Sequence, residues 1–94
     1  MNFKELIILD LSFNFISNIN VLEKVNFKKL KKLYLGSNQI LDFNLLEKVN
    51  FEELNVLDIS ANKISNIIFL EKVNFKKLEI LFLNSNKISN INIL

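Results

Sequence analysis

The chain has 94 residues, half of them apolar, which suits one domain with one continuous core. Its net charge of +2 comes from 12 lysines and 10 acidic residues without any arginine. This balance argues against nucleic-acid binding, because phosphate recognition requires a concentrated basic face. Cysteine and histidine are absent, which excludes a disulfide framework, a thiolate site and the commonest metal ligand.

The whole sequence repeats with a period of 24 residues. The four units are residues 1–24, 25–48, 49–72 and 73–94, and no linker separates them. Self-similarity at such a period is typical of stacked repeats, in which each unit contacts only its neighbours. We therefore predict a single domain over residues 1–94, without dedicated capping segments.

Each unit opens with a short predicted strand. The unit motif, clearest in residues 54–64, reads L-x-x-L-x-I-x-x-N-x-I. Its second and third apolar residues are two positions apart, the spacing that places side chains on one face of a strand. Four such strands, about 4.8 Å apart, would form a parallel sheet. The strand columns are Leu6, Leu9 and Leu11; Leu30, Leu33 and Leu35; Leu54, Leu57 and Ile59; and Leu78, Leu81 and Leu83.

A second apolar pattern returns the chain to the next strand. Apolar residues three positions apart favour a helical or 3₁₀ turn that packs on the inner side of the strands. These columns are Ile16, Ile19 and Leu22; Ile40, Phe43 and Leu46; Ile64, Ile67 and Leu70; and Ile88, Ile91 and Leu94.

Asparagines are expected to begin and end these turns. Asn20 and Asn44 precede Glu23 and Glu47 by three residues, the spacing of a capping box, whereas the third unit has Ile68 at this position. At the other end of the turn, asparagine can adopt the left-handed conformation that glycine usually supplies. We expect this conformation at Asn26, Asn50 and Asn74.

Two further columns are predicted to stabilise the stack. Phenylalanines three residues before each strand-opening leucine would stack as a spine. This spine comprises Phe3, Phe27, Phe51 and Phe75. A polar column inside the apolar pattern requires its amides to bond backbone groups of their own and the adjacent loop. This structural asparagine ladder comprises Asn14, Asn38, Asn62 and Asn86.

The pattern Leu6-x-x-Leu9-x-Leu11-x-x-Asn14-x-Ile16 and its three copies resemble the leucine-rich repeat consensus over essentially the entire chain. The continuation Ile-x-x-Ile-x-x-Leu resembles the internalin-like or phosphatase-regulator subclass, and the Phe-x-x-Leu opening with the 24-residue length resembles the typical animal-receptor subclass. The subclass therefore stays open. The resemblance implies an α/β solenoid with a parallel sheet on the concave face, helical or 3₁₀ segments on the convex face, and protein binding as the usual activity.

Strand residues that point away from the core form a row whose residue types the scaffold does not dictate. The row mixes aromatic, apolar and charged residues as protein interfaces do, although β-propensity alone also favours such residues in strands. Gly36 belongs to this row as well. We predict partner binding by Ile8, Asp10, Ser12, Lys32, Tyr34, Val56, Asp58, Ser60, Ile80, Phe82 and Asn84.

Two exposed features beside the row have more than one interpretation. Phe13 and Phe15 flank the first ladder asparagine, where later units carry smaller or polar residues. They either cover the N-terminal edge or extend a contact patch onto the rim. Lysines recur on the convex side next to glutamates, which is typical of a solvated face with mixed charge.

These observations predict a non-catalytic protein–protein interaction module that binds its partner on the concave sheet face. The alternative is a structural element that self-associates through uncapped repeat ends or is an excerpt of a longer repeat array. Asp10 and Asp58 are two units apart, about 10 Å at sheet spacing, so we expect no enzyme, metal or cofactor.

Apolar runs fall far short of the ~20 residues of a membrane span. The start resembles no signal peptide, and Asn-x-Ser/Thr acceptors are missing. We expect an intracellular chain, cytoplasmic or nuclear, without a membrane partner.

Overall fold

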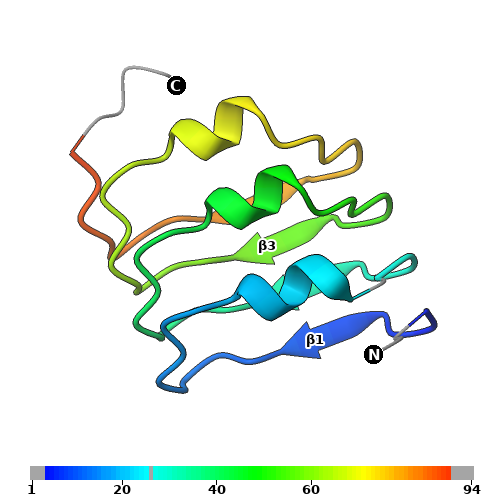
Figure 1. Ribbon diagram of the computed structural model, residues 1–94, viewed down its shortest axis with the longest axis horizontal. Helices are drawn as coiled ribbons and strands as arrows, with labels where there is room; N and C mark the ends of the chain where they lie inside the picture. The colour runs from blue at the N-terminus through cyan, green and yellow to red at the C-terminus, as the bar shows by residue number, and fades with distance from the viewer. Residues whose placement is uncertain (1–3, 26, 90–94) are drawn as a thin grey trace.

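The computed structural model describes residues 4–25 and 27–89, and it shows the units stacked in sequence order (Figure 1). Each unit contributes a strand of three residues, and in the first three units a single 3₁₀ turn follows. The strands are β1 (Ile8–Asp10), β2 (Lys32–Tyr34), β3 (Val56–Asp58) and β4 (Ile80–Phe82). The 3₁₀ helices are η1 (Asn20–Lys24), η2 (Asn44–Glu47) and η3 (Ile68–Glu71).

The strands form one parallel sheet in the order β1-β2-β3-β4. Each strand pairs with the strand 24 residues further along, so that Leu9 lies opposite Leu33, Leu33 opposite Leu57, and Leu57 opposite Leu81. The 3₁₀ helices stack as a second layer beside the sheet (Figure 1). The predicted α/β solenoid with a parallel sheet is confirmed.

The core lies between these two layers, and its side chains are most completely buried in the middle of the stack. Leu33 and Leu57 are fully buried, whereas Leu9 and Leu81 in the same column are only half-buried. The inner units shield each other, because a repeat covers its apolar columns only with the repeats on either side. The apolar columns of the first and fourth units are therefore less completely covered than those of the two inner units.

Phenylalanine rings run through this core. The ring centroids of Phe27 and Phe51 are 5.9 Å apart, and those of Phe51 and Phe75 are 5.7 Å apart, within the range of favourable aromatic pairs. Phe3, Ile91 and Leu94 lie outside the described residues.

A second ring pair lies beside the 3₁₀ turns. In the third unit Phe69 is fully buried against Phe43, with ring centroids 6.3 Å apart. Leu70, which the apolar pattern assigned to the turn column, is only half-buried.

The predicted capping boxes are wrong. Asn20 and Asn44 are the first residues of η1 and η2, and neither helix has a side-chain cap hydrogen bond from its N-cap residue. The N-cap positions belong to Ile19 and Phe43, which the core buries, so the capping oxygen comes from one residue earlier. Three Asx side chains accept the first helical N–H at 2.7, 2.7 and 2.8 Å: Asn18, Asp42 and Asn66.

With the cap supplied by an Asx side chain two residues earlier, the third unit is no exception, although it has Ile68 where the first two units have asparagine. The backbone N–H of Ile68 donates to Asn66 Oδ1, just as the N–H of Asn20 donates to Asn18 Oδ1. The column of Asn18, Asp42 and Asn66 was the missed signal, because Asx side chains two residues before a helical N–H are typical of Asx turns.

The left-handed conformation also occurs elsewhere than predicted. Asn50 and Asn74 are not left-handed, and Asn26 lies outside the described residues. The 3₁₀ helices end on extended or right-handed residues whose N–H bonds the carbonyl three residues back, so no left-handed residue is required there. Positive φ angles of 58°, 55°, 51° and 60° occur instead directly before the asparagine column, at Phe13, Ser37, Ala61 and Ser85.

Candidate functional site

The outer sheet face presents three parallel rows of side chains, one from each aligned strand position. The first row comprises Ile8, Lys32, Val56 and Ile80. The middle row comprises Asp10, Tyr34, Asp58 and Phe82. Ser12, Gly36, Ser60 and Asn84 follow the strands as a third row.

Large apolar side chains on this face are open to solvent at both ends of the sheet. Ile8 is 52% exposed on β1, and Ile80 and Phe82 are 45% and 44% exposed on β4. Tyr34 and Val56, in the middle of the sheet, are intermediate in exposure. The face therefore offers apolar contact area that the fold itself leaves uncovered.

The middle row alternates carboxylates with aromatic rings across the four strands. Tyr34 lies between Asp10 and Asp58, and Asp58 lies between Tyr34 and Phe82. The two carboxylates are consequently separated by a strand and do not form a catalytic pair. An aromatic ring beside a carboxylate on this sheet face is suited to contact a partner side chain that has both apolar and cationic parts.

Each carboxylate is fixed by the serine two residues later. The N–H of Ser60 donates to Asp58 Oδ1 at 2.9 Å, and its hydroxyl donates to the same oxygen at 2.6 Å. Both the hydroxyl and the N–H of Ser12 donate to Asp10 Oδ1 in the same way. These bonds favour the charged form and hold the pKa of Asp10 below its ordinary value of 3.8, with the hydroxyl making the larger contribution.

Gly36 is buried, although the sequence pattern placed it on the open row. A Cβ at this position would lie 3.2 Å from Asp58 Oδ1 and 3.2 Å from Ser60 Oγ. The Asp58 and Ser60 pair thus leans over Gly36, and the absence of a side chain there gives the pair its room. This residue is unavailable for contact with a partner.

The asparagine column lies beneath the turns that follow the strands. Asn62 Nδ2 donates to the carbonyls of Leu35, Ile59 and Ser60 at 3.0, 3.2 and 3.0 Å. Its Oδ1 accepts from the N–H of Ile40 at 3.0 Å. Asn38 and Asn86 make the corresponding bonds to their own and the preceding unit, so these three amides are occupied by the scaffold.

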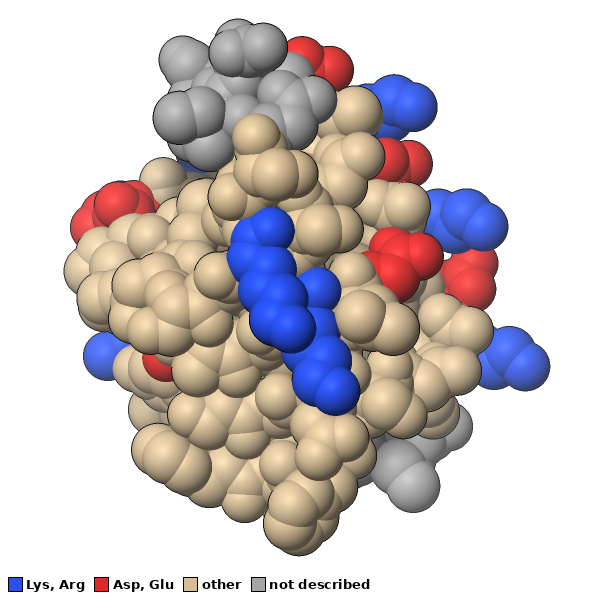
Figure 2. All heavy atoms as spheres, turned by 90° about the vertical axis from the view of Figure 1, so that its left-hand side faces the viewer, with Lys and Arg blue, Asp and Glu red and all other residues tan. Residues whose placement is uncertain are grey.

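A second surface lies over these turns, at the carboxyl ends of the strands. Figure 2 shows lysine side chains in the centre of this face, with acidic side chains to either side of them. Lys63 and Lys87 are the lysines that these turns contain. Phe13 and Phe15, in the turn of the first unit, are 83% and 86% exposed.

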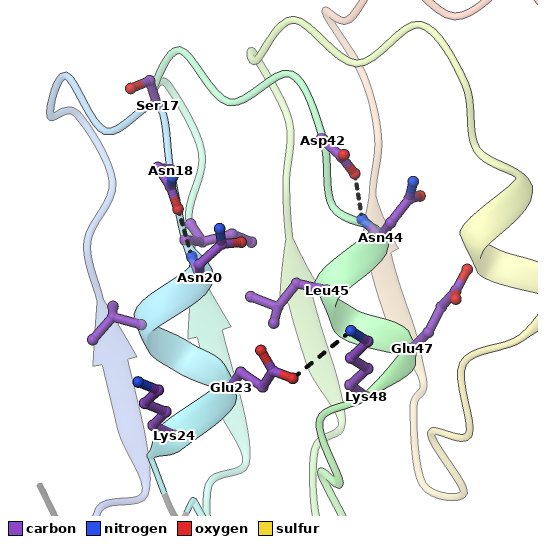
Figure 3. Close-up of a pocket in the computed structure, with 12 residues that line it drawn as sticks. Ser17, Asn18, Asn20, Glu23, Lys24, Asp42, Asn44, Leu45, Glu47 and Lys48 are labelled. Atoms are coloured by element: carbon purple, nitrogen blue, oxygen red, sulfur yellow. Dashed lines mark hydrogen bonds and ion pairs between the residues drawn. The ribbon is translucent and has the colours of Figure 1, made fainter.

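A depression with a volume of about 710 Å³ lies on the opposite layer, between η1 and η2 (Figure 3). Several of its polar groups already have partners. Asn18 and Asp42 accept helical N–H groups, and Lys48 lies 3.9 Å from Glu23 in an ion pair across the depression. The repeat itself explains this arrangement, and we assign it no ligand.

Residues 4–25 and 27–89 contain no group of three or more histidine, cysteine, aspartate or glutamate side chains placed to hold a metal ion. None of their helices is long and apolar enough to cross a membrane.

Comparison with known proteins bears directly on this architecture. No protein-family model matches the sequence, and no curated protein matches it either. Among solved structures, the fold is similar to the crystal structure of an internalin from Listeria monocytogenes, with a TM-score of 0.65 and 27% sequence identity over 97% of the chain. The chain is a leucine-rich repeat solenoid. It spans 32% of the length of that internalin.

In a leucine-rich repeat solenoid, each row of residues lies on a defined side of the fold. The apolar columns face the interior, and the outer sheet face is the concave side of the solenoid, opposite the 3₁₀ helices. Leucine-rich repeat folds of this kind are typically non-enzymatic interaction modules. The concave face is therefore the first place to look for a binding site.

Proposed function

We propose that this leucine-rich repeat chain is a protein-interaction module that binds its partner on the concave sheet face. One observation carries the proposal: the face leaves Ile8, Ile80 and Phe82 about half exposed without any requirement from the core. Exposed apolar groups that lie together with aromatic and charged groups are typical of interaction sites.

The middle row supports the chemistry of such contacts. Tyr34 and Phe82 offer rings on either side of Asp58, whose carboxylate is held in place by Ser60. A rigid carboxylate beside an aromatic ring can receive a basic side chain without first losing conformational entropy. Tyr34 and Phe82 are accordingly the proposed anchors, and Asp10 and Asp58 the groups that favour a basic partner segment.

Substituting the two anchors tests the proposal. Immobilised protein carrying Tyr34→Ala and Phe82→Ala is compared with the parent for the proteins that each captures from a cell extract, measured by quantitative mass spectrometry. We expect the specific partner to be lost from the double variant, because truncation of an aromatic anchor commonly costs about 2 kcal/mol or more in binding. Circular dichroism verifies that the variant keeps its fold.

A matched control removes similar apolar area from another surface. Val21 and Leu41 are 67% and 66% exposed and belong to the layer opposite the sheet, so Val21→Ala with Leu41→Ala should capture the partner as the parent does. The concave-face proposal fails if the anchor variant still captures the same proteins, or if the control variant loses them equally.

A further inference from the structure

We propose that the middle row of the concave face contains two equivalent subsites, which bind two arginine side chains three residues apart in a polyproline II segment of the partner. The first subsite is Asp10 with Tyr34, and the second is Asp58 with Phe82. This inference rests on the proposed concave-face function and specifies the chemistry of the partner that the face would bind.

The two subsites are related by a shift of two repeat units. Tyr34 lies opposite Asp10 on the neighbouring strand, and Phe82 lies opposite Asp58 in the same direction along the stack. A shift by two 24-residue periods therefore places the first carboxylate and ring on the second. A chemical group that fits one subsite accordingly fits the other.

Each carboxylate is held in position and keeps one oxygen for a ligand. Ser60 donates its N–H and its hydroxyl to Oδ1 of Asp58, and Ser12 donates the same two groups to Oδ1 of Asp10. Within residues 4–25 and 27–89, no donor bonds Oδ2 of either carboxylate, and no lysine forms an ion pair with them. Both subsites thus present a fixed negative charge.

An arginine side chain matches this combination of groups. Its planar guanidinium stacks on an aromatic ring while its N–H groups donate to a carboxylate. A lysine fits less well, because its ammonium is a compact charge without a planar face. The charge of the face agrees, since the three rows contain two carboxylates and a single ammonium, that of Lys32.

The distance between the subsites sets the spacing of the two arginines. Asp10 and Asp58 are two strands apart in the sheet, which corresponds to about 10 Å. Residues i and i+3 of a polyproline II segment lie on the same side of it, about 9 Å apart. Residues on one face of a β-strand are about 7 Å or about 13 Å apart, and neither spacing matches the subsites.

The aromatic rings favour a polyproline II segment over a helix. An α-helix reaches a similar distance, about 10.5 Å, only between residues seven apart. Tyr34 and Phe82 provide the kind of aromatic surface on which proline-rich segments dock, and Phe82 is 44% exposed. A spacing of three residues therefore distinguishes the proposed partner from a helical one.

Four short peptides with blocked termini test the spacing by NMR chemical-shift titration of the isotope-labelled 94-residue chain. Three contain two arginines separated by one, two or three prolines, and the fourth has one arginine of the two-proline peptide replaced by alanine. We expect the two-proline peptide to bind about tenfold more tightly than the other three, because it alone places a guanidinium in each subsite. The three two-arginine peptides have the same charge, so general attraction to the face does not separate them.

A change of charge at one subsite should remove this preference. Asp58→Asn keeps an acceptor for Ser60 but loses the negative charge, so the two-proline peptide should bind about tenfold more weakly, like the single-arginine peptide. Asp42→Asn is the matched control on the opposite layer, where Asn18 and Asn66 already serve the same turn position in other units. This control should bind the peptide as the parent does.

Three results overturn the proposal: equal binding of the three two-arginine peptides, binding of none of them, or equal weakening by Asp42→Asn and Asp58→Asn. None of these results touches the concave-face function, which is judged by capture of the partner from an extract. If the variant with Tyr34→Ala and Phe82→Ala loses that partner while the peptide spacing has no effect, the face binds a protein of different chemistry. If the variant keeps the partner, the concave-face function itself fails.

Discussion

Replacing Asn62 by leucine removes one amide of the ladder while nearly conserving side-chain volume, and the structure allows its cost to be worked out group by group. Three carbonyls lose the Nδ2 donor, but each keeps another. Leu35 O still accepts from Asn38, Ile59 O from Asn86, and Ser60 O from the N–H of Ser37.

The N–H of Ile40 is in a different situation. Its bond to Asn62 Oδ1 is buried, and a leucine side chain offers no acceptor in place of that oxygen. A buried donor without a partner costs about 1–3 kcal/mol, and the weakened carbonyl bonds add to this cost. We expect Asn62→Leu to lower the free energy of unfolding by about 3 kcal/mol in total.

Urea unfolding followed by circular dichroism measures this difference, with an unchanged slope verifying that the unfolded states are comparable. Asn14→Leu is the matched control, because the Asn14 amide bonds only exposed carbonyls of its own unit among the described residues. This variant should stay within about 0.5 kcal/mol of the parent. This role of the Asn62 amide is refuted if Asn62→Leu has the same urea midpoint as the parent. It is also refuted if Asn62→Leu and Asn14→Leu lose the same free energy of unfolding, because the hydrogen bond to the Ile40 N–H would then not be the source of the stability.

Three further predictions concern the spine, the turns and the carboxylates. Phe51→Ala should cost about 3–5 kcal/mol in urea unfolding because its ring is fully buried between two others, whereas Phe15→Ala, at 86% exposure, should leave the midpoint unchanged. Ala61→Gly should raise the free energy of unfolding by about 0.5–1 kcal/mol, since relief of a φ of 51° outweighs the added freedom of the unfolded chain; a loss of stability would contradict this. Ser12→Ala should raise the pKa of Asp10 toward 3.8 in an NMR titration, because the hydroxyl bond that lowers it is gone. The pKa of Asp10 is lower in the folded state than in the unfolded state. The Asp10 carboxylate therefore stabilises the fold above the unfolded pKa, and this stabilisation is lost as the pH falls through the folded pKa. Ser12→Ala should make the free energy of unfolding depend less on pH in this acidic range.

The sequence by itself determined the repeat, the strand columns and the parallel register. Residues 24 apart have the same role, so a column such as Leu9, Leu33, Leu57 and Leu81 fixes which strands pair and which side faces inward. A short strand cannot bury its apolar face alone, and only stacking in register satisfies all four at once. The pattern therefore leaves little freedom in the architecture.

Details within each unit were decided by the tertiary structure. The pattern placed the caps at Asn20 and Asn44, but burial of Ile19 and Phe43 at the N-cap positions moved the capping oxygen to Asn18 and Asp42. Local propensity cannot reveal this shift, because it depends on where the core begins. The left-handed residues moved for a related reason: the tight turn lies directly after the strand, at positions such as Ala61, where no glycine marks it.

The candidate site shows the same division. The alternation of the strands assigned Asp58, Tyr34 and Phe82 to the outer face from sequence alone, because side chains two apart share a face. Only the folded chain shows that Asp58, held by Ser60, leans over Gly36, since the approach to Gly36 joins neighbouring units. The repeat period set the rows of the sheet face, and packing between units decided which of their side chains remain open to a partner.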